Sequence, residues 1–262
     1  MTTKERRTQI VKLINDSNNR FKSSDLAELL NVTTETIRKD LIYLDSRKLI
    51  KKFHGGAMPV TEFTEWSFQM RQGENIAAKQ AIALKALEQF PPSGVIFLDA
   101  GSTTCELAKL LVNTELSEKS SLYAIVTNSF SIVNELTGSS FTKFFLGGDI
   151  SDVTRSTSGL WAVNALNSIK IDVAFMGSSG FFSHHGPGTK LSNDALLKSE
   201  VVKNAAKKII LADHTKFASN ALMQFAEWGD IDLLITDSHI DTSQIKALEK
   251  NVEIMIAPAD LC

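Results

Sequence analysis

Residues 97–108 read FLDAGSTTCELA. An apolar run ends at Asp99, a Gly-Ser-Thr-Thr turn follows, and a helical pattern begins. A strand that passes through a short polar turn into a helix is a building unit of α/β domains with parallel sheets. The first amides of such a helix have no partner within it, so they suit an anion such as phosphate. An ordinary helix N-cap is the alternative interpretation of the same residues.

The alternation of apolar runs with helical patterns continues from residue 76 to the end of the chain. The runs that predict strands are 94–100, 122–128, 141–148, 173–178, 208–213, 232–237 and 252–257. Helical patterns cover 76–90, 103–113, 129–137, 193–206 and 242–250. Strands that are apolar along their whole length predict a mainly parallel sheet with helices on both faces. We therefore expect residues 76–262 to form one α/β domain.

The first 57 residues have a different organisation. Apolar residues at helical spacing predict helices over 5–16, 24–30 and 33–48, and residues 49–57 predict a β-hairpin that turns at a Gly-Gly pair. A helix pair with a tight turn, followed by a basic hairpin, is the plan of a winged helix-turn-helix. Residues 58–75 have no clear period, and we interpret them as a linker with anchoring aromatic residues, Trp66 and Phe68.

Composition and charge describe a globular chain with a basic head. Hydrophobic residues make up 43% of the 262 residues and charged residues 22%, and the net charge is −2. Residues 1–57 hold 12 Lys/Arg and 7 Asp/Glu, or +5, whereas the remainder holds 16 and 23, or −7. This asymmetry favours a polyanion-binding module joined to another domain. No apolar run approaches the roughly 20 residues of a membrane span.

The two cysteines, Cys105 and Cys262, exclude a disulfide framework and a cysteine-based zinc site. The N-terminus lacks the apolar core of a signal peptide, so we expect a cytoplasmic protein with no membrane partner. His184 and His185 lie in a Gly/Pro-rich loop without metal-ligand spacing, and we predict no metal site. No G-x-G-x-x-G follows a strand, and we predict no cofactor.

The third predicted helix carries the candidate DNA-reading residues. Its N-terminal part would enter the major groove, where arginine bonds guanine and threonine contacts the thymine methyl group. The candidates on this helix are Thr33, Thr34, Thr36, Arg38 and Lys39. On the hairpin, Lys51, Lys52 and His54 would lie near phosphates. A small helical dimerisation domain with a solvated basic face is the alternative.

Polar residues at the ends of the predicted strands outline a candidate ligand site. In open α/β sheets, ligands bind at the carboxyl ends of the strands. The candidates that the pattern places there are Asp99, Gly101, Ser102, Thr103, Thr104, Asn128, Ser129, Gly147, Gly148, Asp213 and Lys216. Convergent polar groups of this kind favour a pocket. Asp213 would either accept sugar hydroxyls or cap a turn.

Two sets of motifs resemble those of one family. In the head they are R6-x3-I10-x3-I14, T33-x2-T36-I37-R38-K39-D40-L41, L49-I50 and H54-G55-G56-A57. In the body they are F68-x2-R71, N75-x3-K79, I82-A83, F97-L98-D99-A100-G101-S102-T103-T104, V126-T127-N128-S129, G147-G148, F175-M176-G177-S178-S179-G180, Lys198, L211-A212-D213-x2-K216-F217 and L234-I235-T236-D237. Over nearly its whole length the chain is similar to the DeoR-type bacterial transcriptional regulators.

The resemblance implies a sensor domain similar in fold to ribose-phosphate isomerases, which responds to a phosphorylated sugar. It marks Lys198 as a residue that reaches the ligand. Where the isomerases have an acidic residue after the glycine, this chain has Ser178 and Ser179. Ser151 stands where the family often has arginine, and Arg155 nearby is a candidate substitute. Because a serine cannot act as the carboxylate base, these departures favour sensing over catalysis.

The sequence thus predicts a transcriptional regulator, of the repressor type that the family suggests, for a carbohydrate operon. Its partners would be operator DNA, a phosphorylated sugar and further copies of itself in a dimer or tetramer. The alternatives are a sugar-phosphate isomerase with an accessory DNA-binding head and, less favoured by the polar strand ends, a structural adaptor.

Overall fold

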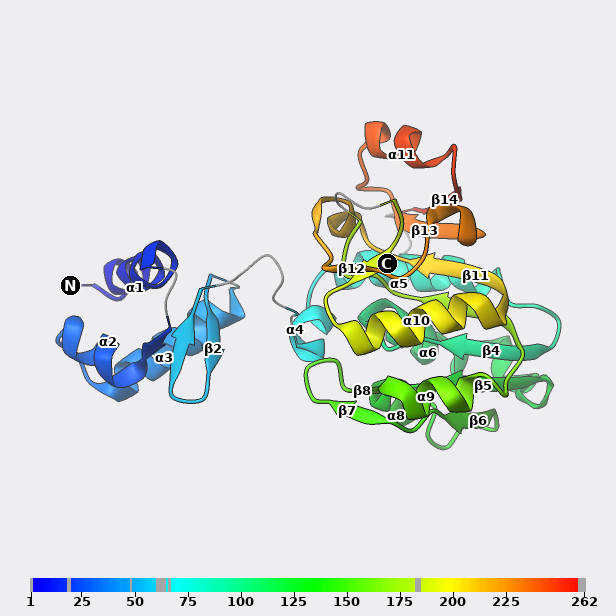
Figure 1. Cartoon of the computed structure of the whole chain (residues 1–262), viewed down its shortest axis with the longest axis horizontal. Helices are drawn as coiled ribbons and strands as arrows, with labels where there is room; N and C mark the ends of the chain where they lie inside the picture. Colours follow the sequence, from blue (N-terminus) through cyan, green and yellow to red (C-terminus); the bar gives the residue numbers. More distant parts are fainter. Residues whose placement is uncertain are drawn as a thin grey trace. The chain divides into compact units, whose positions relative to one another are not determined.

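The structure is a computed structural model that describes residues 2–17, 20–47, 49–59, 65, 67–181 and 185–258. The chain divides into two compact units, Met1–Thr64 and Glu65–Cys262 (Figure 1). Each unit has its own buried core, one of which is formed by residues 10–57. Trp66, His184 and Cys262, which the sequence analysis discusses, lie outside the described residues.

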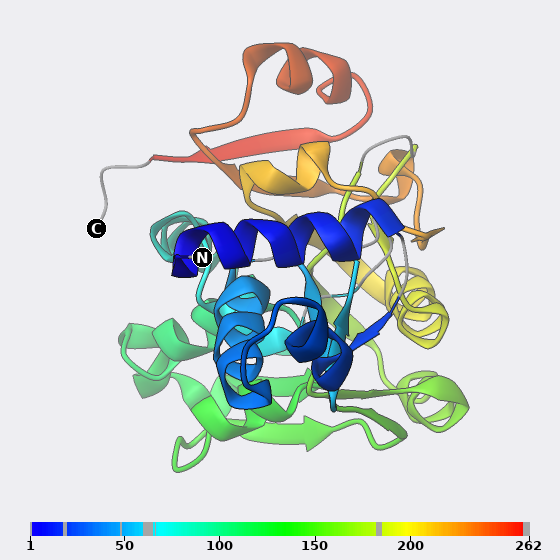
Figure 2. The same cartoon turned by 90° about the vertical axis from the view of Figure 1, so that its left-hand side faces the viewer.

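Unit 1 is a three-helix domain with a small antiparallel sheet. Its elements are α1 (Thr3–Ser17), β1 (Phe21–Lys22), α2 (Ser23–Leu29), α3 (Thr34–Ser46), β2 (Lys51–Phe53) and β3 (Gly56–Met58). The strands pair in the order β1-β3-β2, and Gly55, with φ of +92°, makes the turn between β2 and β3. Figure 2 shows α1 in dark blue, with α2 and α3 in lighter blues. This arrangement is the winged helix-turn-helix that the sequence predicts.

The core of unit 1 follows the helical spacing of the sequence. Ile10 and Ile14 of α1 pack with Ile37, Leu41 and Leu44 of α3, and all five side chains are buried. A charged contact joins the same two helices, because the buried Asp40 accepts hydrogen bonds from Arg6 Nε at 2.5 Å and Arg7 Nε at 2.7 Å. The orientation of α3 is therefore fixed by both apolar packing and a paired carboxylate.

Unit 2 is built on a seven-stranded sheet in which all neighbouring strands are parallel. The strands are β4 (Gly94–Leu98), β5 (Tyr123–Thr127), β6 (Thr142–Phe145), β9 (Ile171–Met176), β11 (Ala205–Leu211), β13 (Leu233–Asp237) and β14 (Glu253–Ala257). Their order is β14-β13-β11-β9-β4-β5-β6. Each predicted strand corresponds to one of these seven, which confirms the fold class.

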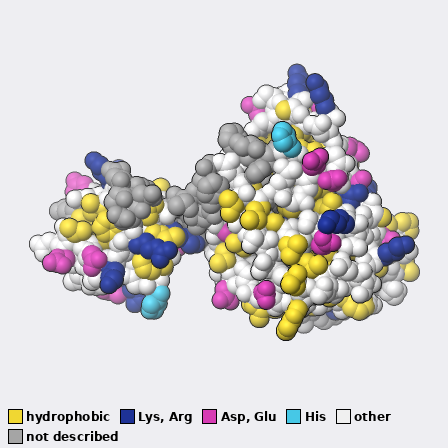
Figure 3. All heavy atoms as spheres, viewed as in Figure 1, with side chains coloured by type: hydrophobic (Ala, Val, Ile, Leu, Met, Phe, Trp, Pro, Cys, Tyr) yellow, Lys and Arg dark blue, Asp and Glu magenta, His cyan; other side chains and the backbone are white. Residues whose placement is uncertain are grey.

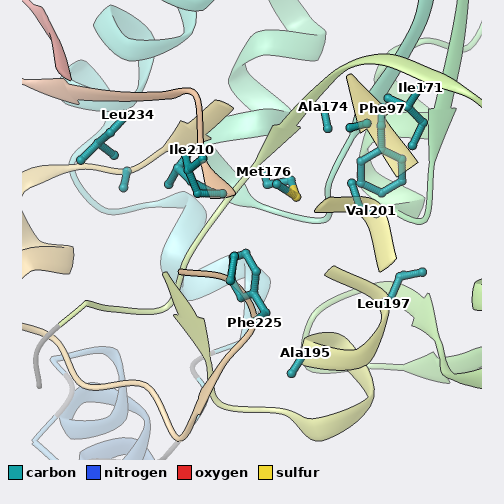
Figure 4. Packing of buried hydrophobic residues seen from close by; sticks show 14 of the residues in the cluster. Phe97, Ile171, Ala174, Met176, Ala195, Leu197, Val201, Ile210, Phe225 and Leu234 are labelled. Atoms are coloured by element: carbon teal, nitrogen blue, oxygen red, sulfur yellow. The ribbon is translucent and has the colours of Figure 1, made fainter. Parts of the chain in front are cut away.

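Helices cover both faces of this sheet (Figure 1). On one side lie α5 (Ile76–Leu87), α6 (Ser102–Leu111) and α8 (Phe130–Glu135), and on the other α9 (Gly159–Leu166), α10 (Ser192–Asn204) and α11 (Thr242–Leu248). Residues of β4 alternate between the two cores, with Ile96 and Leu98 facing α5 and α6 and Phe97 facing α9 and α10. Figure 4 shows Phe97 and Met176 with Leu197 and Val201 of α10, in the core between the sheet and the helices α9, α10 and α11.

Several short elements were not predicted from the sequence. They are α4 (Phe68–Gln72), α7 (Glu115–Glu118), β7 (Asp149–Ser151), β8 (Ser156–Ser158), β10 (Gly188–Thr189), β12 (Met223–Gln224) and the 3₁₀ helices η1 (Ser120–Leu122), η2 (His214–Ala218) and η3 (Trp228–Asp230). Elements of two to five residues are too short to show a period. Within the predicted linker 58–75, Phe68 is buried and its amide donates to the carbonyl of Val153 at 2.7 Å.

The chain order of the strands creates one switch point. From β4 the chain adds β5 and β6 on one side and then returns to place β9, β11, β13 and β14 on the other. A crevice forms where neighbouring strands lead in opposite directions, at their carboxyl ends. Here that position is between β4 and β9. None of the helices among the described residues is long and apolar enough to cross a membrane.

Candidate functional site

A cavity lies at the switch point between β4 and β9. Its lining comes mainly from the segment before α5, the turn between β4 and α6, the loop after β9, α10 and η2. The β7–β8 turn, β10 and β11 contribute one residue each. The lining residues are Glu65, Arg71, Asp99, Ala100, Gly101, Ser102, Thr103, Thr154, Gly177, Ser178, Ser179, Thr189, Asp194, Lys198, Leu211 and Lys216. Segments that are far apart in the sequence thus converge on one polar cavity.

A buried ion pair forms the floor of the cavity. Lys198 Nζ donates to Asp99 Oδ2 and, at 3.1 Å, to the carbonyl oxygen of Gly177. The amide of Gly177 donates to the same Asp99 oxygen at 2.9 Å. Both charged side chains are almost fully buried. Asp99 therefore joins the ends of β4 and β9 to α10.

Asp194 lies one helical turn before Lys198 on α10, and its carboxylate accepts a hydrogen bond from Thr189 Oγ1 at 2.6 Å. Burial raises the pKa of Asp194, although the charge of Lys198 opposes this. Burial alone would lower the pKa of Lys198, but the charges of Asp194 and Asp99 outweigh it and raise that pKa. Lys198 is therefore a cation held between two acidic side chains.

The N-terminus of α6 faces the same cavity. Gly101 is the N-cap, and Ser102 and Thr103 occupy the first helical positions, where the amides have no partner within the helix. Thr104 has a different role, because its hydroxyl accepts from the Gly101 amide at 2.9 Å and contacts the Asp99 carbonyl at 2.6 Å. Gly101, Ser102 and Thr103 thus line the cavity, whereas Thr104 holds the turn that shapes it.

Arg71 and Glu65 close one side of the cavity. Arg71 Nε lies 3.3 Å from Glu65 Oε1, and Ser179 Oγ donates to Glu65 Oε2 at 3.1 Å. Arg71 stands on the short helix α4, and the buried Lys79 donates hydrogen bonds to the carbonyls of Arg71 and of Glu74, which follows the helix. Burial lowers the pKa of Lys79 to about 8, with Asp213 opposing the shift. The arginine is therefore held in place from two directions.

Ser178 and Ser179 form hydrogen bonds within the wall of the cavity. Ser178 Oγ contacts the carbonyl of Gly188 at 2.8 Å and accepts from the Gly188 amide at 3.1 Å. These contacts support the bridge between Gly180 and Gly188. Ser179, by contrast, bonds Glu65. The two serines thus order the loop after β9, and neither supplies a carboxylate.

Lys216 and Asp213 follow β11. Lys216 lines the cavity from η2, and its charge contributes to the low pKa of Asp213, which burial alone would raise. Asp213 is the N-cap of η2 and accepts hydrogen bonds from the Thr215 amide at 3.1 Å and from Asn75 Nδ2 at 3.3 Å. Asp213 is not among the cavity-lining residues and acts in the described structure as a turn-capping group.

The remaining predicted ligand residues lie around the β7–β8 hairpin, outside the lining of the cavity. Asn128 Nδ2 donates to the carbonyl of Thr157 at 2.7 Å, and Ser129 caps α8. A Cβ on Gly148 would lie 2.3 Å from the carbonyl oxygen of Ser158, so a larger residue is excluded there. Gly147 precedes this close approach, and Arg155 is an exposed residue of the hairpin turn with φ of +53°.

Of the candidates for the ligand site, the structure brings together Asp99, Gly101, Ser102, Thr103, Ser178, Ser179, Lys198 and Lys216. It does not bring Thr104, Asn128, Ser129, Gly147, Gly148, Arg155 and Asp213 to the cavity lining. Five further polar residues line the cavity that were not predicted as ligand residues from the sequence: Glu65, Arg71, Thr154, Thr189 and Asp194. Asp194 had a usable signal, since it lies four residues before Lys198 and shares its helix face.

In unit 1, the candidate DNA-reading residues lie at the start of α3. Thr33 is the N-cap, and its hydroxyl accepts from the Thr36 amide at 3.2 Å. Thr34, Arg38 and Lys39 are exposed, and the Arg38 side chain retains 67% of its accessible surface. The buried stripe of α3 faces the opposite side of the helix. The exposed side chains at this end are therefore available to a groove.

The hairpin carries the other basic candidates. Lys51 and Lys52 on β2 are half-buried, and His54 in the turn is exposed. The amide of Lys52 donates to Asp45 Oδ1 at 2.7 Å, which fixes β2 against the end of α3. Lys and Arg side chains (dark blue) appear on the face of unit 1 that is visible in Figure 3.

Comparison with known proteins agrees with this two-part structure. Residues 6–63 match the model of the DeoR-like helix-turn-helix domain, and residues 74–238 match the DeoR C terminal sensor domain. The HTH-type transcriptional regulator GlpR of Haloferax volcanii is 33% identical over 250 residues, which are 95% of each chain. The lactose phosphotransferase system repressor of Staphylococcus aureus is 25% identical over 97% of this chain and 100% of that relative.

Among solved structures, a ribose 5-phosphate isomerase from Methanocaldococcus jannaschii aligns with 55% of each chain at 18% identity and a TM-score of 0.41. The two family matches cover both units, and the GlpR relative spans nearly the whole chain. The chain belongs to the DeoR family of transcriptional regulators, with a DNA-binding head and a sensor domain.

Proposed function

We propose that this protein represses a carbohydrate-utilisation operon, with unit 1 binding operator DNA and unit 2 binding a phosphorylated sugar that weakens the DNA complex. The observation that carries the proposal is the cavity at the switch point. Arg71, Lys198 and Lys216 line it together with the N-terminus of α6. Arginine, lysine and free helix amides are the groups that proteins use to bind phosphate.

The cavity lining contains the three cations Arg71, Lys198 and Lys216 and also three carboxylates, so the place of a phosphate depends on which cations it can reach. Lys198 is buried and paired with Asp99, so we assign the phosphate to the side lined by Arg71, Lys216 and the amides of Ser102 and Thr103, where it would compete with Glu65 for Arg71. Asp194 would accept hydrogen bonds from sugar hydroxyls at the other side of the cavity. The Staphylococcus relative is named as the repressor of a lactose phosphotransferase system, which supports the same ligand class.

Sensing fits this cavity better than turnover does. A sugar-phosphate isomerase needs a carboxylate base placed on a carbon of the substrate. Ser178 and Ser179 supply none, and the carboxylates of the lining already have partners. Asp99 is paired with Lys198, Glu65 with Arg71, and Asp194 accepts from Thr189 Oγ1. We therefore propose that the protein binds the sugar phosphate without converting it and needs no cofactor to do so. Incubation of the full chain with ribose 5-phosphate should give no product.

The DNA-binding part of the proposal is supported by α3. The side chains of Thr34, Arg38 and Lys39 are exposed near the start of α3. In this fold, that helix is the one that enters the major groove. The hairpin lysines would contact the flanking phosphates. Because helix-turn-helix proteins read paired half-sites as symmetric dimers, we propose that the protein acts as a dimer or tetramer. It would do so in the cytoplasm, where the operator is.

A thermal-shift screen tests the ligand class. A ligand that binds only the folded chain raises its stability by about 2.7 kcal/mol when present at about 100 times its Kd. We expect at least one aldose or ketose phosphate to raise the Tm, whereas its unphosphorylated form does not. If the unphosphorylated sugar stabilises the chain equally, or no sugar phosphate stabilises it, the proposed ligand class is wrong.

A further inference from the structure

A second group of polar side chains lies at the carboxyl ends of β11 and β13, outside the lining of the cavity. His214 begins η2 after β11, Asp237 ends β13, and His239 lies in the following turn. The proposed sensing function uses none of these three residues. Their ligand-type atoms nevertheless all lie within 4.8 Å of one another.

The geometry of this group is centred on one carboxylate oxygen. His214 Nδ1 and His239 Nδ1 each lie 2.9 Å from Asp237 Oδ2, and the two rings have their centroids 5.3 Å apart. The backbone holds the carboxylate in place, because the His214 amide donates to Oδ1 at 2.7 Å and the His239 amide donates to Oδ2 at 3.2 Å. Two imidazoles thus converge on a fixed, buried carboxylate.

These distances are those of hydrogen bonds, and they are close to the separation of two ligands on one metal ion. Two ligands that each lie about 2.1 Å from a tetrahedral zinc ion are about 3.4 Å apart, so each imidazole would have to move away from the carboxylate oxygen by only about 0.5 Å to admit the ion. The Asp237 side chain is 1% exposed, whereas His214 and His239 are 32% and 63% exposed. An ion placed between the rings would therefore have protein ligands on one side and water on the other.

We propose that His214, Asp237 and His239 bind a divalent transition-metal ion of the Zn²⁺ class. Two imidazole nitrogens and one carboxylate oxygen favour zinc, cobalt or nickel, whereas magnesium and calcium prefer oxygen ligands. Water would complete the coordination. The ion would join η2 to the turn after β13, and η2 carries Lys216, which lines the effector cavity.

The alternative is a hydrogen-bonded triad in which both rings donate Nδ1–H to Asp237 and no ion binds. Metal titration separates the two. The full chain is treated with EDTA and desalted, and is then titrated with ZnCl₂ by calorimetry and with CoCl₂ by visible absorption. We expect one Zn²⁺ per chain, visible bands from bound Co²⁺, and no heat from MgCl₂.

Two histidine variants locate the site. His239 is exposed, so His239→Asn should fold normally, and we expect it to weaken zinc binding at least about tenfold. His185, an exposed histidine of the same unit, provides the matched control, and His185→Asn should bind zinc as the parent does. The Tm of the metal-free variants verifies folding. The proposal is wrong if the parent binds no zinc, if His239→Asn binds it unchanged, or if His185→Asn abolishes binding.

Discussion

The Oε1 atom of Glu65 lies 3.3 Å from Nε of Arg71, and both side chains line the cavity at the switch point. Glu65 is also the first residue of unit 2. A carboxylate thus already faces the cation that is best placed for a ligand phosphate. If the ligand phosphate binds Arg71 as proposed, it would compete with Glu65 for this side chain, and ligand binding would be coupled to the position of Glu65 at the start of unit 2.

Removing the competing charge should strengthen ligand binding. Glu65→Gln keeps the shape of the side chain and its hydrogen-bonding capacity toward Ser179. The two side chains are only 18% and 8% exposed, so solvent screens this ion pair little, and we expect the Kd of the effector to fall at least about fivefold, or about 1 kcal/mol. Calorimetric titration of the parent and the variant with the same sugar phosphate measures it. A weaker affinity in Glu65→Gln would mean that Glu65 binds the ligand and does not compete with it.

Removing the cation should have the opposite effect. We expect Arg71→Ala to raise the Kd of the sugar phosphate by about tenfold or more, because an arginine–phosphate contact is charge-assisted and often bidentate. Arg71→Lys keeps the charge and should recover only part of the affinity. The same calorimetric titration applies, with Lys85→Ala as a control on α5 whose side chain contacts Glu88. Unchanged affinity in Arg71→Ala would place the phosphate elsewhere.

The three hydroxyl residues of the α6 turn should separate into two classes. Ser102→Ala with Thr103→Val removes two hydroxyls that line the cavity, and we expect loss of effector binding with little change in Tm. Thr104→Val removes a buried hydroxyl that bonds the turn, and we expect it to lower the free energy of unfolding by about 1–3 kcal/mol. Urea unfolding and thermal shift measure both. Equal destabilisation by the two variants would contradict this division.

Arg38 should read the operator. Its side chain is exposed at the N-terminal end of α3, so Arg38→Ala should leave the Tm unchanged while it weakens operator binding by about 1–3 kcal/mol. Arg47→Ala removes the same charge at the C-terminal end of the helix and should have a smaller effect. Fluorescence anisotropy with labelled DNA gives both affinities. If the two variants bind equally well, α3 is not oriented as proposed.

Lys79 should make stability depend on pH. Its folded pKa of about 8 lies below the ordinary value of 10.5, so between these values the unfolded chain binds more protons than the folded one. Stability from this group therefore rises with pH across that window. We expect the unfolding free energy of the parent minus that of Lys79→Met to increase from about pH 8 to about pH 10, by up to about 1.4 kcal/mol per pH unit. A difference that is constant with pH would contradict the low pKa.

The sheet was predictable because its strands are buried on both faces. Runs such as 94–100 and 232–237 are apolar along their length, and parallel strands of this kind leave a clear signal between turn residues. The short hairpin β7–β8 left no such signal. Its residues Ser156 and Thr157 are polar and buried, and they are held by contacts with Ser129 and Asn128 from a distant segment.

The cavity was only partly predictable for a related reason. Residues that directly follow a strand, such as Asp99 and Ser178, could be placed from the sequence, because the strand end fixes their position. Asn128 and Gly148 also follow strands, but packing directs them to the β7–β8 hairpin. Glu65 and Arg71 lie in the segment 58–75 that the sequence presents as a linker, and they reach the site through folded contacts, from Ser179 to Glu65 and from Glu65 to Arg71.

The measurement that tests the account most directly is the release of operator DNA by the effector. A labelled fragment from upstream of the gene is bound to the full chain, and sugar phosphates are added while anisotropy is recorded. We predict a salt-sensitive, sequence-selective complex that a sugar phosphate dissociates and that its unphosphorylated form does not. Arg71→Ala should bind the DNA as tightly as the parent but resist release. Release of Arg71→Ala at the same ligand concentration as the parent, or no release of the parent by any sugar phosphate, would contradict the account.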